Sequence, residues 1–227
     1  TVMYEEGKLL TAGGWNSGSD IASTNRSLLI DLNGPSPQVS EISAMINPRK
    51  FHNGVLLPNG EVLVFGGNTS GRKFNDTGSI FAAEAWNPDT QQWRELAAAA
   101  VPRNYHSTAL LMLDGRVFTG GGGLCNCAAD HQDAEIYTPP YLYRADGSLA
   151  ARPVITQVPG VAEAGADLPV VATHGMRRFS LIKMSSTTHG MNTDVRNLNL
   201  PFVESAPGEY SLELHGNVNV LTPGYWM

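Results

Sequence analysis

The sequence has 227 residues, 42% of them hydrophobic and 16% charged, and carries a formal net charge of −6 at neutral pH. This composition is typical of a globular protein with a substantial apolar core. A pI near 5.4 and the lack of any Lys/Arg run argue against a nucleic-acid partner, and no apolar segment approaches the roughly 20 residues of a membrane-spanning helix.

The chain opens on "TVMYEEGKLL" and ends on "LTPGYWM". The opening segment has neither the charged nor the apolar region of a signal peptide. Both ends have the pattern of a strand, so we expect the sequence to be truncated on both sides.

Three similar segments, "GKLLTAGGWN", "GEVLVFGGNT" and "GRVFTGGGGL", begin at Gly7, Gly60 and Gly115, at intervals of 53 and 55 residues. Each has a glycine for a turn, alternating apolar residues for a strand, and then adjacent glycines that permit positive φ or close backbone packing. This strand and diglycine pattern is that of a kelch repeat, whose period is about 50 residues.

Two further parts of the unit recur. "RKFHNGVLLPNG" from Arg49 is similar to "RNYHSTALLMLDG" from Arg103, and "AEAWNPDT" from Ala83 is similar to "AEIYTPPY" from Ala134. Each unit is therefore predicted to form four short strands, as in a β-propeller blade. The predicted fold class is all-β, with the last kelch-type blades of a partial β-propeller over residues 1–150. An incomplete ring leaves strand edges unpaired, so we expect these blades to need the missing ones.

Tyr105 and His106 lie side by side, although neighbours on a regular strand point to opposite faces. His52 holds the equivalent place in the preceding unit, so a histidine here is also explained as a structural residue that bonds only within its own blade. The change from Phe51 to Tyr105 adds a hydroxyl that could bind a ligand or carry a proton. Pro102 removes a backbone donor and favours a non-strand conformation around the pair.

Cys125 and Cys127 form a C-x-C pair. They could be reduced thiols or a short disulfide loop in an oxidising compartment. A metal site is less favoured, because the C-x-C pair has no second pair of ligands to complete it. N-x-[ST] sequons at Asn25, Asn68 and Asn75 are compatible with secretion.

After residue 150 the repeat ends. The apolar segments "LPVVATHG", "RRFSLIKM" and "YSLELHG" are short and separated by Gly, Pro and Asn. They predict a second domain over residues 151–227, an immunoglobulin-like β-sandwich that is truncated at its C-terminus.

Taken in order, "RNYHSTALLMLDGRVFTGGGGLCNCAADHQDAEIYTPPYLY", "RPVIT", "TTHGMNTDVR" and "PGYWM" resemble the C-terminal part of galactose oxidase and other copper radical oxidases. The resemblance implies a kelch propeller of roughly seven blades with copper on its axis, and a loop of the following domain that adds the last histidine ligand. It implies a secreted oxidase of the galactose or glyoxal oxidase type. Such an enzyme oxidises a sugar, another primary alcohol or an aldehyde with O2 and releases hydrogen peroxide.

By the same resemblance, Tyr105 is the axial copper ligand and the general base, and His106 and His189 are the histidine ligands. His174 is a rival for the last position because "THGM" occurs twice, but only His189 precedes the Asn-Thr-Asp of the family's motif. Two imidazoles and a phenolate suit Cu(II) with an open coordination position.

The resemblance also places Phe74 on an aromatic of the substrate pocket, although it could simply pack on its own blade. Cys125 and Cys127 fall on the family's C-x-x-C disulfide with one residue fewer between them. The radical cofactor, a cysteine cross-linked to a second tyrosine, is expected from residues outside this chain. Two alternatives remain open: a kelch and sandwich module that binds carbohydrate or protein without chemistry, and one piece of a polypeptide whose remainder lies elsewhere in an assembly.

Overall fold

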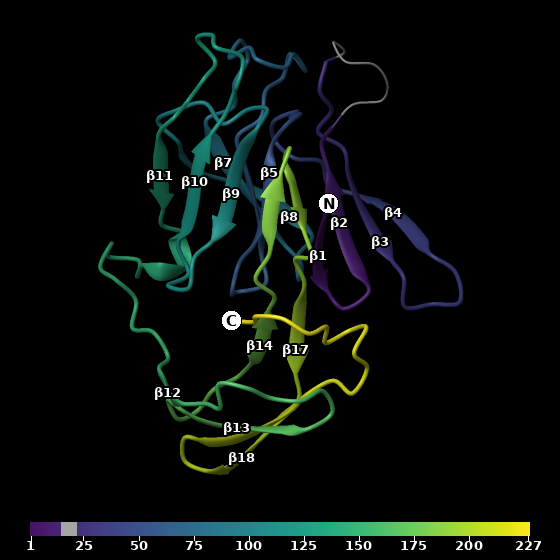
Figure 1. Cartoon of the computed structure of the whole chain (residues 1–227), viewed down its shortest axis with the longest axis vertical. Coiled ribbons are helices and arrows are strands. Elements are labelled where there is room, and N and C mark those ends of the chain that lie inside the picture. Colours follow the sequence, from purple (N-terminus) through teal and green to yellow (C-terminus); the bar gives the residue numbers. More distant parts are fainter. Residues whose placement is uncertain (15–21) are drawn as a thin grey trace. The chain divides into compact units, whose positions relative to one another are not determined.

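The computed structural model describes residues 1–14 and 22–227, and their regular structure is almost entirely β (Figure 1). The expected all-β fold class is confirmed. The helical structure among these residues is one 3-10 turn, Pro140–Leu142, and no described helix is long and apolar enough to cross a membrane. Trp15 and Asn16 of the first repeated segment lie outside the described residues.

The repeated part of the chain forms three antiparallel sheets, in each of which neighbouring strands follow chain order. The first contains β1 (Val2–Glu5), β2 (Lys8–Ala12), β3 (Ser27–Asp31) and β4 (Gln38–Ile42). The second contains β5 (Asn53–Leu56), β6 (Val62–Phe65), β7 (Ala82–Asn87) and β8 (Gln92–Ala98). The third contains β9 (Ser107–Leu111), β10 (Val117–Gly121) and β11 (Ala134–Tyr137). The assignment of these sheets to a kelch propeller stays a prediction.

The paired glycines of the repeat permit close contact between successive sheets. Gly66 and Gly67 follow β6 with φ of 72° and 84°, a region that favours glycine. A Cβ atom on Gly66 would lie 2.1 Å from the carbonyl oxygen of Arg103. The amide of Gly67 donates a hydrogen bond of 2.8 Å to that same oxygen. The diglycine pattern therefore marks the place where the second sheet meets the segment that leads into β9.

The arginine that opens each repeated "RKF" or "RNY" segment is a buried structural residue. The Arg49 guanidinium lies 2.7 Å from the Glu84 carboxylate on β7, and both side chains are 0% exposed. In the next unit, the buried Arg103 guanidinium pairs with Asp133 at 2.8 Å and with Glu135 on β11 at 3.3 Å. Each arginine thus links the segment that precedes the first strand of a sheet to the third strand of the same sheet.

Apart from the hairpin described below, the strands of the C-terminal part form one four-stranded sheet and one strand pair. The sheet contains β12 (Ile155–Gln157), β13 (Asp167–Ala172), β19 (Glu209–Glu213) and β18 (Phe202–Ala206), in that spatial order. The pair consists of β14 (Phe179–Ile182) and β17 (Asn197–Leu200). Their buried faces form one core that includes Val170, Phe179, Leu198 and Tyr210. The immunoglobulin-like assignment stays a prediction.

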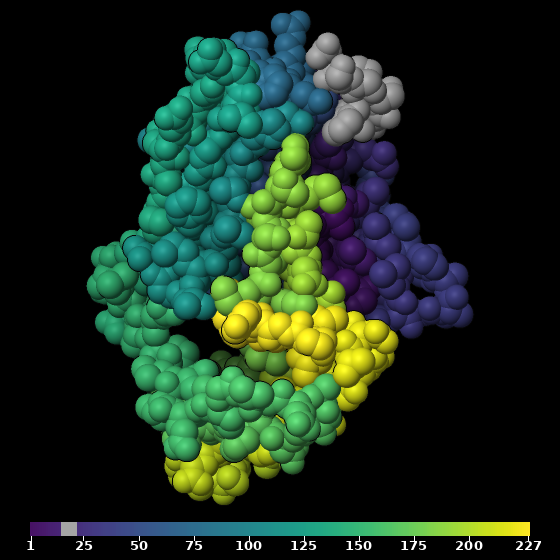
Figure 2. Space-filling view, in the orientation of Figure 1, coloured from purple at the N-terminus to yellow at the C-terminus, as the bar shows by residue number. Residues whose placement is uncertain are grey.

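The described residues form two compact units, Thr1–Pro139 with Ser185–Arg196, and Pro140–Met184 with Asn197–Met227. The segment Ser185–Arg196 contains the hairpin of β15 (Ser186–Thr188) and β16 (Met191–Thr193). It packs with the first unit, where Figure 2 shows it in light green.

A hydrogen bond between the hydroxyls of Thr187 and Thr108 joins this hairpin to β9. Residues 140–150, which the sequence analysis placed with the blades, pack with the second unit. The domain division at residue 150 stays a prediction.

Candidate active site

Tyr105 and His106 do not lie on a regular strand, whose geometry would point their side chains to opposite faces. Both precede β9, and His106 has a left-handed φ of 68°. A hydrogen bond of 3.0 Å from the Ser107 amide to the Asn104 carbonyl closes the turn around the pair. The ring centroids of Tyr105 and His106 are therefore only 4.0 Å apart, with 31° between the ring planes. The two side chains face one site although they are neighbours in sequence.

His189 completes the group from the tip of the β15–β16 hairpin, where its φ is 54°. Its ring centroid lies 4.8 Å from that of His106 and 5.6 Å from that of Tyr105. His174, the rival candidate, belongs to the other unit, where its Nδ1 lies 2.7 Å from a carboxylate oxygen of Glu204. The structure therefore brings His189 to the Tyr105–His106 pair. Its role as a metal ligand stays a prediction.

Hydrogen bonds to the imidazoles decide which ring nitrogens can bind a metal. Nδ1 of His106 lies 2.7 Å from the carbonyl oxygen of Gly123. Because a carbonyl only accepts, Nδ1 carries the proton and Nε2 keeps a lone pair for a metal. Nδ1 of His189 lies 2.7 Å from the hydroxyl of Thr188, which leaves its Nε2 outside that hydrogen bond. A phenol and two oriented imidazoles are a donor set that suits Cu(II).

Two phenylalanines and a lysine border this group. Phe74 is 39% exposed, and its ring centroid lies 5.3 Å from that of Tyr105 and 5.7 Å from that of His106. The ring centroid of Phe51 lies 5.1 Å from that of Tyr105, and Nζ of Lys73 lies 5.0 Å from the centre of the Tyr105 ring. Phe74 thus packs on the candidate site itself, beyond its own sheet. The repeat aligns Phe51 with Tyr105 but does not predict their contact, and no sequence pattern pointed to Lys73.

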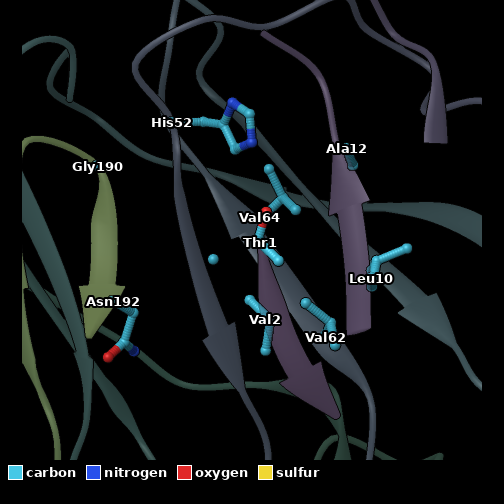
Figure 3. A pocket seen from close by; sticks show the side chains of 10 residues that line it. Thr1, Val2, Leu10, Ala12, His52, Val62, Val64, Gly190 and Asn192 are labelled. Atoms are coloured by element: carbon cyan, nitrogen blue, oxygen red, sulfur yellow. The ribbon is translucent and has the colours of Figure 1, made fainter. Parts of the chain in front are cut away.

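His52 does not belong to this group. Loss of water around its imidazole, together with the positive charges of the amino terminus and Arg49, lowers the pKa of His52 to about 3 against the opposing effect of the Ala12 backbone. Nδ1 of His52 is buried and has no hydrogen-bond partner among the described residues, so the expectation that His52 makes hydrogen bonds only within its own blade stays a prediction. Figure 3 shows His52 lining a pocket of the first unit together with Gly190 and Asn192 of the hairpin.

Cys125 and Cys127 are joined by a disulfide with an S–S distance of 2.06 Å. The Asp130 carboxylate accepts hydrogen bonds of 2.8 Å from the Cys125 amide and 3.3 Å from the Cys127 amide. These backbone hydrogen bonds, the Cys125 one foremost, lower the pKa of Asp130. The two sulfurs and Asp130 are close enough to surround a metal, but bonded sulfurs are not the thiolates that a metal needs. Only Leu124 separates Cys125 from Gly123, whose carbonyl oxygen lies 2.7 Å from Nδ1 of His106.

Two family models match separate parts of the chain. Residues 28–139 match the family described as glyoxal oxidase N-terminus, and residues 152–227 match the galactose oxidase-like early set domain. A galactose oxidase of Gibberella zeae is 36% identical over 233 residues, covering 100% of this chain and 34% of the relative. An aldehyde oxidase of Arabidopsis thaliana is 29% identical over 190 residues, covering 75% of this chain and 31% of the relative.

A solved structure has a similar fold over the whole chain. It is described as a novel fungal alcohol oxidase of the AA5 family in complex with copper, and it matches with a TM-score of 0.94 and 35% identity. The chain belongs to the copper radical oxidase family that includes galactose oxidase and the glyoxal oxidases. It covers 34% of the galactose oxidase and 49% of the alcohol oxidase structure.

Proposed function

We propose that the protein containing this chain is a copper-dependent oxidase that converts a primary alcohol or aldehyde to the aldehyde or acid and reduces O2 to hydrogen peroxide. The observation that carries this proposal is the meeting of Tyr105, His106 and His189 from two distant segments of one compact unit. The similarity to a galactose oxidase, an aldehyde oxidase and an alcohol oxidase supports the same class of small-molecule substrate.

The chain's own residues have distinct roles in this proposal. His106 would hold the metal through Nε2, since its Nδ1 donates a hydrogen bond to the Gly123 carbonyl. His189 would hold the metal through a ring nitrogen. Bound copper would supply a Lewis acid that acidifies the alcohol and a centre that accepts one electron. The phenol oxygen of Tyr105 would accept the alcohol proton as general base. Both cysteines form the disulfide, so the cross-linked Cys–Tyr radical cofactor would come from residues outside this chain.

The remaining parts of the proposal concern architecture and location. We propose that the three sheets are kelch blades of a propeller, that residues 151–227 form an immunoglobulin-like sandwich, and that the protein is secreted. The repeat of the buried arginine and of the diglycine turns supports the first part. The disulfide supports secretion, because disulfides persist in oxidising compartments.

Removal of the metal should abolish activity. We expect the full-length protein to form peroxide from at least one of galactose, methylglyoxal and benzyl alcohol, and to lose this activity after dialysis against a chelator. Added Cu(II) should restore it, whereas Zn(II) should not, because zinc undergoes no redox change. Peroxide formation that survives complete removal of copper would contradict the proposal.

A further inference from the structure

The loop of residues 71–79 carries Phe74 to the candidate site, where the side chain stays partly exposed. Phe74 is 39% exposed and has a left-handed φ of 51°, a conformation that a bulky residue adopts only when its surroundings impose it. Its ring nevertheless lies against both Tyr105 and His106. Other contacts of the loop must therefore hold Phe74 in place.

The start of the loop is fixed by Asn68. Its side-chain oxygen accepts a hydrogen bond of 2.8 Å from the Gly71 amide, and its Nδ2 donates one of 3.1 Å to the Arg72 carbonyl. These two bonds precede Phe74 in the chain, and beyond Phe74 Asn68 makes only a longer contact of 3.5 Å, from Nδ2 to the Asn75 carbonyl. A loop that is held only before Phe74 would leave the position of this exposed ring undetermined. The contacts beyond Phe74 therefore decide where the ring lies.

Asp76 provides the anchor beyond Phe74. Its Oδ1 accepts a hydrogen bond of 3.0 Å from Nδ2 of Asn104, and its Oδ2 lies 3.0 Å from Nε2 of His131. Because a carboxylate only accepts, His131 donates from Nε2 whether the imidazole is neutral or charged. Asn104 also donates to the hydroxyl of Ser79 at 2.8 Å. One carboxylate thus joins the loop to two other segments of the chain.

Both segments are those that position the candidate metal ligands. Asn104 is buried and directly precedes Tyr105. The amide of His131 donates a hydrogen bond of 3.1 Å to the Gly122 carbonyl, next to Gly123, which accepts from the His106 imidazole. The position of Phe74 is consequently tied to the two side chains that its ring contacts.

We infer that Asp76, Asn104 and His131 form a clamp that positions Phe74 over the Tyr105–His106 pair, and that these three residues set the affinity of the site for its organic substrate. The inference rests on the proposed function for the identity of that substrate. The clamp itself is a property of the described residues and can be tested without turnover. Its members are positioning residues, since they act on substrate through Phe74.

The first test measures the loop directly by hydrogen exchange in the full-length protein. Asp76→Ala and His131→Leu should speed the exchange of amides in residues 71–79 by about tenfold, the scale of losing a hydrogen bond to a charged group. His131→Gln, which keeps a side-chain N–H donor, should stay within about threefold of the unaltered protein. Asp146→Ala is the control, because Asp146 is a loop aspartate that accepts hydrogen bonds from Ser148. Unchanged exchange in both Asp76→Ala and His131→Leu would overturn the clamp.

The second test measures how the clamp affects KM and kcat for the substrate. For whichever alcohol or aldehyde gives peroxide, Asp76→Ala should raise KM by about tenfold, leave kcat within about threefold and leave the copper content unchanged. In a Phe74→Leu background the same change should have little further effect on KM, because the clamp acts through that ring. A fall in kcat with unchanged KM, or full additivity with Phe74→Leu, would overturn the positioning role. If no substrate gives peroxide, the proposed function fails, while the exchange measurement still decides the clamp.

Discussion

Replacement of Tyr105 by Phe should reduce turnover of the full-length protein by about 100-fold or more, the usual scale of a lost general base. The protein should still fold, because Phe51 shows that a phenyl ring is accommodated at the equivalent position of the preceding unit. It should also still bind copper through His106 and His189. The change removes one hydroxyl at the place where the proposed reaction transfers a proton. Peroxide formation at saturating substrate, together with metal analysis, measures the two effects separately.

Tyr143→Phe is the matched control for this change. Tyr143 lies in the other unit and is 43% exposed, so loss of its hydroxyl should leave turnover unchanged. If Tyr105→Phe keeps turnover within threefold of the unaltered enzyme, Tyr105 is not the proton acceptor. Loss of copper in that variant would instead show that the hydroxyl is needed to hold the metal.

Replacement of Arg49 by Met should lower the free energy of unfolding by about 3–5 kcal/mol, the range found when one partner of a buried ion pair is removed. Arg49 donates to the Glu84 carboxylate and also to the carbonyls of Gly66 and Ala82, at 2.8 and 2.6 Å. Without the guanidinium, a fully buried carboxylate loses its counter-charge, and two carbonyls lose a donor. Denaturant unfolding of the full-length protein measures this loss.

Arg26→Met provides the comparison for a surface ion pair. The Arg26 and Glu41 side chains are 55% and 57% exposed, so solvent screening should leave this pair with little effect on the free energy of unfolding. Combining Arg49→Met with Glu84→Leu should recover part of the loss, because no charge is then left buried without a partner. An Arg49→Met protein as stable as Arg26→Met would show that this buried pair does not hold the second sheet together.

The strands of the repeated part could be predicted because their signals are local. Alternation of apolar residues has the period of a strand, and the adjacent glycines at 66 and 67 occupy positive φ next to another backbone. The repeated arginine was visible in the sequence, but its burial was not. Arg49 and Glu84 are 35 residues apart, and no local pattern shows that they meet in the interior.

The candidate site could be predicted only in part, for the same reason. The repeat showed that Tyr105 differs from Phe51, but periodicity would have placed the Tyr105 and His106 side chains on opposite faces. The left-handed φ of His106 reverses that expectation. The position of Lys73 beside Tyr105, and the packing of the 185–196 hairpin with the first unit, depend on contacts between distant segments. Resemblance to a known family, rather than the pattern of residues, pointed to His189.

The central claim is that His106 and His189 bind one copper ion together, and electron paramagnetic resonance of the Cu(II) full-length protein tests it most directly. The spectrum should show coupling to two imidazole nitrogens. His189→Ala should remove one of these and weaken copper binding by about 100-fold or more, since loss of even an outer partner of a metal ligand costs 10–100-fold. His174→Ala should change neither the coupling nor the affinity. A His189→Ala protein with an unchanged copper spectrum and affinity would contradict the account.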